Sequence, residues 1–460
     1  MTNAALRRPL AAIILAAGQG TRMKSRLHKV LHPLAGKPML HHLLDSVAGL
    51  GAERTVVVVG AGGEQVEASV AGRDVAIAWQ REQLGTGHAV AQAKDALAGF
   101  AGDVLILYGD VPLVSAATMA RMIERLNFGI EPRAVVLGFR PDDAGAYGRI
   151  IAGPDGTIAK MVEYKDASDA ERSVDLCNSG LMAVRSTDLF VLLDSIGNDN
   201  AAGEYYLPDI VMLPGHASAV IEVEDPAEVA GVNSRAELAG LEGVWQQRRR
   251  AEAMADGVSL IAPETVWFSH DTVLARDVRV EPNVWFGPGV KVAEGATIHA
   301  FSHVEGATIG PHCAVGPYAR LRPGAVMEEG AKIGNFVEMK KARMGKGAKA
   351  SHLTYLGDAD VGAGANIGAG TITCNYDGYF KYQTVIGEGA FIGSNSSLVA
   401  PVNIGAGATV GAGGVVTADV APDALALIRA PQVEKPGWAK RFRDAMLAKK
   451  AAAKAGKVGS

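Results

Sequence analysis

The glycine turn Gly18-Gln19-Gly20 and two cations that follow it, Arg22 and Lys29, are the residue types that bind phosphate. Glycines let successive backbone N–H groups converge on an anion, and basic side chains add charge-assisted contacts. The chain lacks the Gly-x-x-x-x-Gly-Lys of a P-loop, and Met23 stands where a dinucleotide-binding turn has its third glycine. The pattern therefore predicts a nucleotide site of another kind.

Two further motifs fit a nucleotide site. The stretch QLGTGHA, residues 83–89, is a second glycine turn after an apolar run and is suited to holding a flat base through backbone groups. LYGDVP, residues 107–112, ends an apolar run on Asp110. Mg²⁺ in proteins is usually bound by one or two carboxylates plus substrate phosphates, so Asp110 is a candidate metal ligand. Taken alone, Asp110 could equally be a turn former or a helix cap.

A different chemistry is indicated near His352, which is surrounded in the sequence by Lys340, Lys341 and Tyr355, with Arg320 and Arg322 before them. A lone histidine is often structural, but this one lies among residue types that bind phosphate. Transfer of an acetyl group from a thioester to an amine needs a base for the amine proton, and histidine is the residue most often used for that purpose. It also needs a hydrogen-bond donor for the developing oxyanion.

The elements that must position the first set of residues form an α/β pattern from Leu10 to about Val232. Apolar runs of strand length alternate with helical patterns, which predicts a mostly parallel sheet with ligands at the carboxyl ends of the strands. Predicted strands are 11–18, 54–60, 75–80, 103–110 and 133–139, and predicted helices are 39–50 and 118–126. Residues 234–256 are predicted to form a linking helix, because Ser234 and Glu237 have the spacing of a capping box.

Beyond this helix, aliphatic or aromatic residues recur every six positions, a spacing typical of a parallel β-helix with one inward side chain per short strand. The series is Val280, Phe286, Val292, Ile298, Val304, then Ile309, Val315, Leu321, Met327 and Ile333, and later Ile386, Ile392, Leu398, Ile404, Val410 and Val416. The pattern is interrupted near 340–361 and 371–385, where loops of a binding face are expected. The basic, alanine-rich tail from Ala448 onward is expected to be frayed or disordered.

Composition gives weaker constraints. The 460 residues carry a net charge of −4, which provides no general attraction to nucleic acid or to a membrane. Three widely spaced cysteines favour neither a disulfide framework nor a thiolate zinc site. Arg7-Arg8 and the following apolar run could pass for a signal peptide, but that run ends in the glycine turn and not in a cleavage site. No apolar run reaches the ~18 residues of a membrane helix, and a cytoplasmic protein without membrane insertion is expected.

The first half resembles the sugar nucleotidyltransferases, which join a sugar 1-phosphate to a nucleoside triphosphate and release pyrophosphate. The motifs that carry the resemblance are LAAGQGTRM, QLGTGHA, YGD, YGRI, VEYKDA, CNSG and GVN. The resemblance implies a UTP and UDP-sugar site formed by Leu15, Ala16, Ala17, Gly18, Gly20, Arg22, Lys29, Gln80, Gly85, Thr86, Gly148, Glu163, Asn178 and Asn233. Within it, Arg22 and Lys29 would contact phosphates, Gln80, Gly85 and Thr86 uracil, and Gly148, Glu163 and Asn178 the sugar. Asp110 and Asn233 would bind Mg²⁺, although Asn233 also stands directly before the capping box.

The hexads, such as IGPHCA and VGAGGV, resemble those of hexapeptide acyltransferases, which are left-handed β-helices that assemble as trimers. RLRPGA, GNFVEMKKAR, SHLTYLGD and NIGAGTITCNYDG look like the acetyltransferase half of the bifunctional enzymes that make UDP-N-acetylglucosamine. This resemblance implies His352 as general base, Glu338 as its orienting partner and the Ser394 backbone as oxyanion donor. It further implies glucosamine-phosphate contacts by Arg322, Lys340, Tyr355, Asn366, Asn375 and Tyr376, and acetyl-CoA contacts by Ala369, Ser394, Ala412 and Arg429. Without the family, Arg429 could equally be a solvated edge cation.

The resemblance covers residues 10–440 in one order. It predicts a sugar nucleotidyltransferase domain at 1–233, a linking helix at 234–256 and an acetyltransferase β-helix at 257–460. The expected enzyme acetylates glucosamine 1-phosphate and couples the product to UTP, a step of cell-envelope precursor synthesis for peptidoglycan and lipopolysaccharide. A homotrimer acting on small molecules, without nucleic acid, is expected. The alternatives are a nucleotidyltransferase whose β-helix acts on another amino sugar or is only structural, and a non-catalytic regulatory or scaffold protein.

Overall fold

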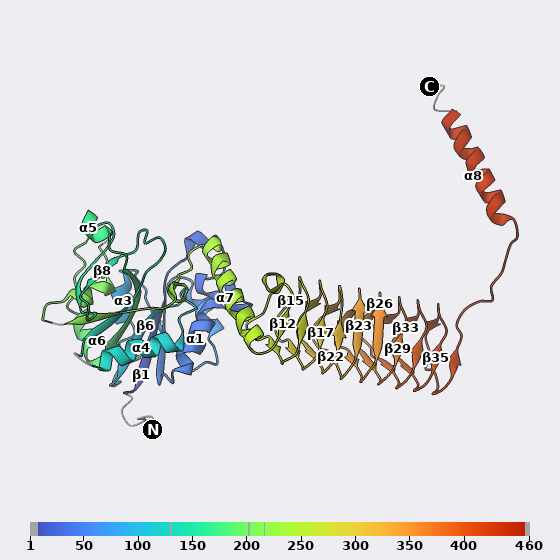
Figure 1. Ribbon diagram of the computed structural model, residues 1–460, viewed down its shortest axis with the longest axis horizontal. Coiled ribbons are helices and arrows are strands. Elements are labelled where there is room, and N and C mark those ends of the chain that lie inside the picture. The colour runs from blue at the N-terminus through green and yellow to red at the C-terminus, as the bar shows by residue number, and fades with distance from the viewer. Residues whose placement is uncertain (1–7, 129–130, 201–202, 216, 456–460) are drawn as a thin grey trace. The chain divides into compact units, whose positions relative to one another are not determined.

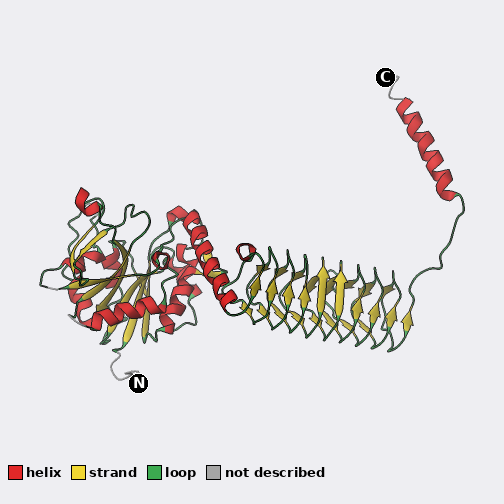
Figure 2. Ribbon diagram, in the orientation of Figure 1, coloured by secondary structure: helices red, strands yellow, loops and turns green. Residues whose placement is uncertain are grey.

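The computed structural model describes residues 8–128, 131–200, 203–215 and 217–455, and the chain divides into two compact units (Figure 1). The first unit comprises residues 1–276 and 280–290, and the second comprises 277–279 and 291–460. The two units differ in secondary structure: the first mixes helices and strands, and the second consists of short strands followed by a helix near the C-terminus (Figure 2). No helix in the described ranges is long and apolar enough to cross a membrane.

The first unit contains a sheet with the strand order β11, β7, β10, β6, β1, β4, β5. β1 pairs in parallel with β4 and β6, whereas β10 is antiparallel to both β6 and β7. The sheet is therefore mostly parallel, as expected. The strand bounds are β1 Leu10–Ala16, β4 Arg54–Val59, β5 Ala76–Trp79, β6 Asp103–Tyr108, β7 Ala134–Phe139, β8 Arg149–Ala152, β9 Ile158–Val162, β10 Cys177–Arg185 and β11 Ser218–Glu222, with the small pair β2 Pro33–Leu34 and β3 Lys37–Pro38.

Helices cover both faces of this sheet, so its strands are buried on both sides. Ile14 of β1 packs in one apolar cluster with Leu43 of α1 and Met122 of α4, and the neighbouring Ile13 packs in another with Val90 of α3 and Leu192 of α6. Alternate residues of the strand therefore serve two cores. The helix bounds are α1 Met39–Gly49, α2 Gly63–Ser69, α3 Thr86–Ala91, α4 Ala116–Asn127, α5 Asp169–Arg172 and α6 Ser186–Leu193, with the 3₁₀ turns η2 Thr21–Met23, η3 Lys29–Leu31, η4 Leu207–Met212, η5 Pro226–Val229 and η6 Pro263–Thr265.

The predicted linking helix is α7, Arg235–Ala255, and its start is fixed by the predicted capping box. The Ser234 hydroxyl accepts from the Glu237 backbone N–H at 3.2 Å, and the Glu237 carboxylate accepts from the Ser234 backbone N–H at 3.0 Å. The box satisfies two donors that a helix N-terminus otherwise leaves without partners. Gln246 attaches the middle of α7 to Phe268 through two hydrogen bonds of 2.7 and 2.9 Å.

A parallel β-helix follows, in which three short strands per coil form three sheets (Figure 2). Its residues up to 276 and from 280 to 290 are counted in the first unit, and the rest of it makes up most of the second unit. All sixteen inward residues predicted from the hexads are buried, each with 3% exposure or less. The strand bounds are β12 Ser259–Leu260, β13 Val273–Leu274, β14 Arg279–Val280, β15 Trp285–Phe286, β16 Lys291–Val292, β17 Thr297–Ile298, β18 His303–Val304, β19 Ala307–Ile309, β20 Ala314–Val315, β21 Arg320–Leu321, β22 Ala325–Met327, β23 Lys332–Asn335, β24 Glu338–Lys340, β25 Arg343–Met344, β26 Lys349–His352, β27 Tyr355–Gly357, β28 Ala359–Val361, β29 Asn366–Ile367, β30 Ile372–Cys374, β31 Thr384–Ile386, β32 Phe391–Ile392, β33 Ser397–Val399, β34 Val402–Ile404, β35 Thr409–Val410, β36 Val415–Val416 and β37 Leu425–Ala426.

The first predicted interruption, near 340–361, is wrong. The coils continue through it, with Met339, Met344, Ala350, Leu356 and Val361 fully buried as inward residues. The steps between them are five or six residues, and an inward alanine does not stand out in an alanine-rich sequence. The second predicted interruption is confirmed, since the chain leaves the coil after β30 and returns at β31, with a bridge between Tyr376 and Lys381 in the excursion.

The tail prediction also needs correction. Residues from Ala448 to Ala455 continue the helix α8, Trp438–Ala455, and residues 456–460 lie outside the described ranges. Alanine and lysine are strong helix formers, and this propensity prevails over the low hydrophobicity of the tail.

Candidate active sites

The first site is a cavity of about 360 Å³ at the carboxyl ends of β1, β5 and β6. Its lining contains nine of the predicted residues: Leu15, Ala16, Ala17, Gly18, Lys29, Gln80, Gly85, Thr86 and Asp110. Gly20 contributes indirectly. Its φ is +62°, and an added Cβ would lie 2.6 Å from Cβ of Lys29, so glycine allows the turn to approach this lysine closely.

Lys29, Asp110 and Asn233 meet at one point of this site. The Lys29 ammonium pairs with the Asp110 carboxylate and donates to Asn233 Oδ1 at 3.1 Å. Asn233 is brought there by the backbone, because the Val232 N–H donates to the Asp110 carbonyl at 3.0 Å. Asn233 thus lies beside Asp110, and its own N–H also donates to Glu237 of the capping box.

Hydrogen bonds within the first unit hold the part of the cavity that was predicted to bind the base. Gln80, 4% exposed, donates to the Gly85 carbonyl at 3.0 Å, and the Leu207 N–H donates to the Thr86 hydroxyl at 3.0 Å. Gly85 has a φ of +100°, and an added Cβ would lie 2.6 Å from the Tyr205 carbonyl oxygen. The glycine is required both by its backbone conformation and by this close approach.

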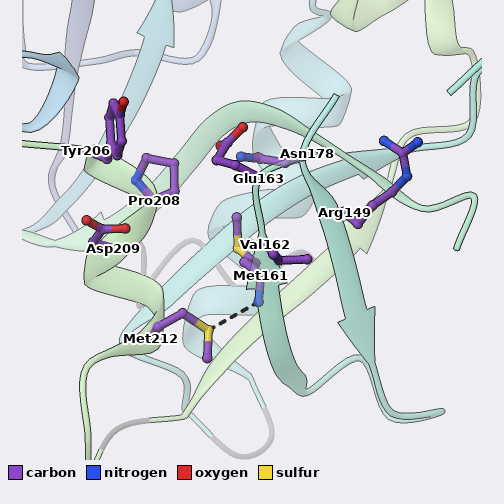
Figure 3. A pocket seen from close by; sticks show the side chains of 10 residues that line it. Arg149, Met161, Val162, Glu163, Asn178, Tyr206, Pro208, Asp209 and Met212 are labelled. Carbon is purple, nitrogen blue, oxygen red and sulfur yellow. Dashed lines mark hydrogen bonds between the residues drawn. The ribbon is translucent and has the colours of Figure 1, made fainter. Parts of the chain in front are cut away.

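The predicted sugar-binding residues line a second cavity of the same unit (Figure 3). The Asn178 N–H donates to the Gly148 carbonyl at 2.9 Å, and an added Cβ on Gly148 would lie 3.3 Å from the Glu163 carboxylate. Glu163 and Asn178 are among the side chains that line this cavity (Figure 3). Partial burial raises the pKa of Glu163, and the carboxylates of Asp166 and Asp209 add to the effect.

Sequence reasoning missed the segment that borders both cavities. Glu204 lines the first cavity, and Tyr206, Pro208 and Asp209 line the second. The acidic and aromatic run Glu204-Tyr205-Tyr206 was the available signal. Other unpredicted lining residues are Gln83, which donates to the Ala17 carbonyl at 3.0 Å, Tyr108 and Arg149. Burial raises the pKa of the Tyr108 hydroxyl, and the Asp110 charge raises it further.

Arg22 is not among the residues that line the cavity. It is exposed in η2, the turn that directly follows Gly20. A group of three or more His, Cys, Asp or Glu side chains that could hold a metal ion is absent from the described residues. A divalent cation at Asp110 and Asn233 would therefore depend on substrate phosphates for further ligands.

In the β-helix, the predicted acetyl-CoA residues form a column along one corner. Strands β26, β29, β32 and β35 pair in register, so His352, Ala369, Ser394 and Ala412 occupy equivalent positions in successive coils. Arg429 follows β37, and its guanidinium donates to the Ala412 carbonyl at 3.3 Å. Neighbouring strands are separated by ~4.8 Å, so His352 and Ala412 are roughly 14 Å apart along the column.

A second group of predicted residues lies on another sheet of the β-helix, the one that contains β21, β24 and β27. Arg322 donates to Glu338 at 2.8 Å, and Glu338 is aligned with Tyr355 in the next coil. Lys340 lies near Lys381 and Arg322, and the charges of these two cations lower the pKa of the Lys340 ammonium. Lys381, which sequence reasoning missed, comes from the excursion after β30 and lies over the Tyr376 ring. The concentration of positive charge is suited to a phosphate group.

Two of the predicted side chains have hydrogen-bond partners in the structure that the predicted roles did not include. Glu338 was expected to orient His352, but its carboxylate contacts Arg322, and His352 Nδ1 lies 2.5 Å from Asn335 Oδ1 instead. Glu338 and His352 belong to strands of different sheets. Asn375 was expected to contact the sugar, but it is 5% exposed and donates to Asp358 at 2.5 Å, which holds the excursion to the preceding coil. Asn366 is partly exposed on β29 and Tyr376 is exposed.

Comparison with known proteins identifies the chain at this point. A family model described as a MobA-like NTP transferase domain matches residues 12–172, and one described as a hexapeptide repeat of succinyl-transferase matches residues 383–418. The chain is 68% identical over 450 residues to the bifunctional protein GlmU of Rhizorhabdus wittichii, an alignment that covers 97% of this chain and 99% of the relative. It is 67% identical to the protein of the same name from Novosphingobium aromaticivorans and 65% to that from Sphingopyxis alaskensis, each over 96% of this chain and 98% of the relative. The chain belongs to the GlmU family. It is a bifunctional enzyme with uridyltransferase and acetyltransferase activity, and its hexapeptide repeats form the left-handed β-helix of that family.

Proposed function

We propose that the two activities are divided between the units. The β-helix acetylates glucosamine 1-phosphate with acetyl-CoA, and the α/β part couples N-acetylglucosamine 1-phosphate to UTP, giving UDP-N-acetylglucosamine and pyrophosphate. In this proposal residues 1–233 form the uridyltransferase, 234–256 link the parts and 257–460 form the acetyltransferase. One observation carries it: the residue types needed for the two transfers gather at two separate places, around Lys29 and around His352.

For uridylyl transfer, the first unit positions the reactants and neutralises charge, so a nucleophilic side chain is not required. Gln80, Gly85 and Thr86 hold the uracil, Lys29 and Arg22 contact the phosphates, and Glu163 and Asn178 bind the sugar. Asp110 and Asn233 fit a Mg²⁺ ion, because their oxygens already converge on one cation, the Lys29 ammonium. When bound, Mg²⁺ supplies neutralisation of the phosphate charge. With Asp110 and Asn233 holding the metal, Lys29 would be available to bind a substrate phosphate.

For acetyl transfer, the column from His352 to Arg429 has the order that acetyl-CoA requires. The thioester would lie near His352, and the phosphates of the coenzyme near Arg429, with the pantetheine arm along Ala369, Ser394 and Ala412. A Cβ on Gly368 would lie 2.6 Å from the Ser394 nitrogen, so glycine keeps that N–H accessible as an oxyanion donor. Arg322, Lys340 and Tyr355 bind the sugar phosphate, with Asn366 and Tyr376 on the sugar.

We also propose a homotrimer, assembled through an apolar ladder on one corner of the β-helix. Phe301, Tyr318 and Phe336 stack face to face with ring centroids 4.9 and 5.3 Å apart, and Leu353 continues the row. Each of the four is at least 47% exposed and has a positive φ, a conformation that is strained for large side chains. A second copy of the chain would cover this surface.

The trimer is tested by light scattering. Wild-type protein is expected to have three times the 47.7 kDa chain mass. The double variant Tyr318→Asn, Phe336→Asn is expected to dissociate, because asparagine tolerates the left-handed conformation but removes the apolar contact. A wild-type monomer contradicts the trimer, and a trimeric double variant moves the interface away from the ladder.

The catalytic proposal is tested with purified protein, acetyl-CoA, Mg²⁺, UTP and a set of amino-sugar phosphates. We expect thiol release with glucosamine 1-phosphate and then UDP-N-acetylglucosamine. Thiol release that prefers another amino sugar contradicts the substrate assignment. UTP and acetyl-CoA are metabolites of the cytoplasm, and we propose that compartment as the place of action.

A further inference from the structure

Within the part of the chain that the structure describes, the His352 imidazole has one side-chain hydrogen-bond partner, and the chemistry of that partner determines which ring nitrogen carries the proton. Its Nδ1 lies 2.5 Å from Oδ1 of Asn335. An amide oxygen can only accept a hydrogen bond, so Nδ1 must carry the proton. In the neutral ring the lone pair is then on Nε2. The contact therefore selects the tautomer in which Nε2 is the free base.

The backbone holds the two residues opposite each other. Asn335 and His352 are aligned in register at the ends of β23 and β26, and the Leu353 N–H donates to the Asn335 carbonyl at 3.0 Å. Gly334 allows the coils to approach, because an added Cβ would lie 2.6 Å from the Ser351 carbonyl carbon. The carbonyl of His352 is held in turn by the Thr354 hydroxyl at 2.8 Å. Backbone hydrogen bonds therefore fix the positions of both coils that carry the contact between Asn335 and His352.

Glu338, the acid predicted to orient His352, already has another partner. Glu338 is bound by Arg322 at 2.8 Å and lies 3.8 Å from Arg320, on a sheet different from that of His352. The other charged side chains of β23 and β26, Lys332 and Lys349, stand at the opposite ends of those strands. His352 thus has a neutral hydrogen-bond partner, which orients the ring.

We propose that Asn335 is the positioning residue for acetyl transfer and that it fixes His352 with Nε2 directed at the reacting amine. This inference rests on the proposed role of His352 as general base. In the reaction the amine nitrogen bonds to the acetyl carbon and the bond from that carbon to sulfur breaks. The amine proton passes to Nε2 of His352 and then to the departing thiolate of coenzyme A. Asn335 touches neither substrate and acts through the imidazole.

The test uses the full chain with Asn335→Ala and Asn335→Asp. For Asn335→Ala we expect kcat of acetyl transfer to fall about 10- to 100-fold, by analogy with the loss of a partner that orients a metal-bound histidine, with KM for acetyl-CoA nearly unchanged. Asn335→Asp restores an acceptor, so kcat at high pH should recover. Its carboxylate favours the imidazolium, so the acid limb of the kcat/KM profile should move to higher pH.

The matched control is Asn403→Ala, which removes an asparagine of β34 that bonds to Asp419. Its acetyl transfer should be unchanged. Normal kcat in Asn335→Ala, or an unmoved acid limb in Asn335→Asp, overturns the positioning role. If Asn335→Ala does not fold, the pH profile of Asn335→Asp still decides. If His352→Ala retains full acetyl transfer, His352 is not the general base. That outcome overturns the proposed role of His352, and the inference about Asn335 falls with it.

Discussion

The two sites show two ways of bringing residues together. In the first unit, Lys29 contacts a carboxylate 81 residues away and an amide 204 residues away. In the β-helix, Asn335 and His352 are 17 residues apart and Arg322 and Glu338 are 16 apart, about one coil in each case. In a solenoid, residues about one coil apart in the sequence lie next to each other. In an α/β sheet, the order of the strands decides which distant residues meet. Contacts in the first site therefore depend on the whole fold, and contacts in the second depend on neighbouring coils.

The largest expected effect tests whether the sites are independent. Asp110→Ala should lower uridylyl transfer at least 100-fold and leave acetyl transfer intact, since it removes a carboxylate that fits Mg²⁺. His352→Ala should lower acetyl transfer about 10²- to 10⁴-fold and spare uridylyl transfer, because it removes the general base. Each variant is assayed for both activities, so each serves as the control for the other. Loss of both activities in either variant contradicts the separation.

A smaller effect tests how strictly the first site depends on long-range packing. Gly85→Ala should lower kcat/KM for UTP about 10- to 100-fold, because backbone strain and the contact with the Tyr205 carbonyl would displace the loop. Gly72→Ala is the matched control. Gly72 also has a positive φ, +87°, but an added Cβ there has nothing within 4 Å. It should lose some stability and keep its kinetics. An equal fall in kcat/KM in both variants would mean that the loss comes from the strained backbone conformation alone and not from the close approach to Tyr205.

The smallest expected effect concerns the stability of the first unit at acid pH. Burial lowers the pKa of His42 in α1 to about 4, against the raising influence of its hydrogen bond to the Leu34 carbonyl. The unfolded chain therefore binds more protons than the folded chain between pH 6.5 and 4, so stability is lost as pH falls through that window. His42→Gln should reduce this loss by about 1–3 kcal/mol and keep an N–H donor for Leu34.

The measurement for His42 is the rate of thermal inactivation of uridylyl transfer at pH 7 and pH 5. The control is His303→Gln, which changes an exposed histidine of β18 and should not alter the ratio of the two rates. His28, His32 and His41 also have a pKa lowered by burial, so His42→Gln should remove part of the acid sensitivity and not all of it. An unchanged ratio in His42→Gln would show that His42 is not one of the groups responsible.

Much of the fold could be predicted because its signals are local. The strands that precede Gly18, Gly60 and Gly109, the capping box of Ser234 and the sixfold spacing of the β-helix are each visible within a short stretch of sequence. The error at 340–361 has the same origin, since an inward alanine and five-residue steps weaken a local pattern without ending the coil. Residues 204–209 were missed because only the packing against Leu84 and Gly87 brings them to the cavities.

The sequence by itself determined the two scaffolds, the buried row of the β-helix and the residue types available for phosphate binding and proton transfer. Side-chain period and helix capping depend on neighbours along the chain, so they can be read from it. The tertiary structure decided that Asp110 and Asn233 share the Lys29 ammonium and that His352 faces Asn335 and not Glu338. Those partnerships depend on strand order and on the register between coils, which composition and spacing leave open.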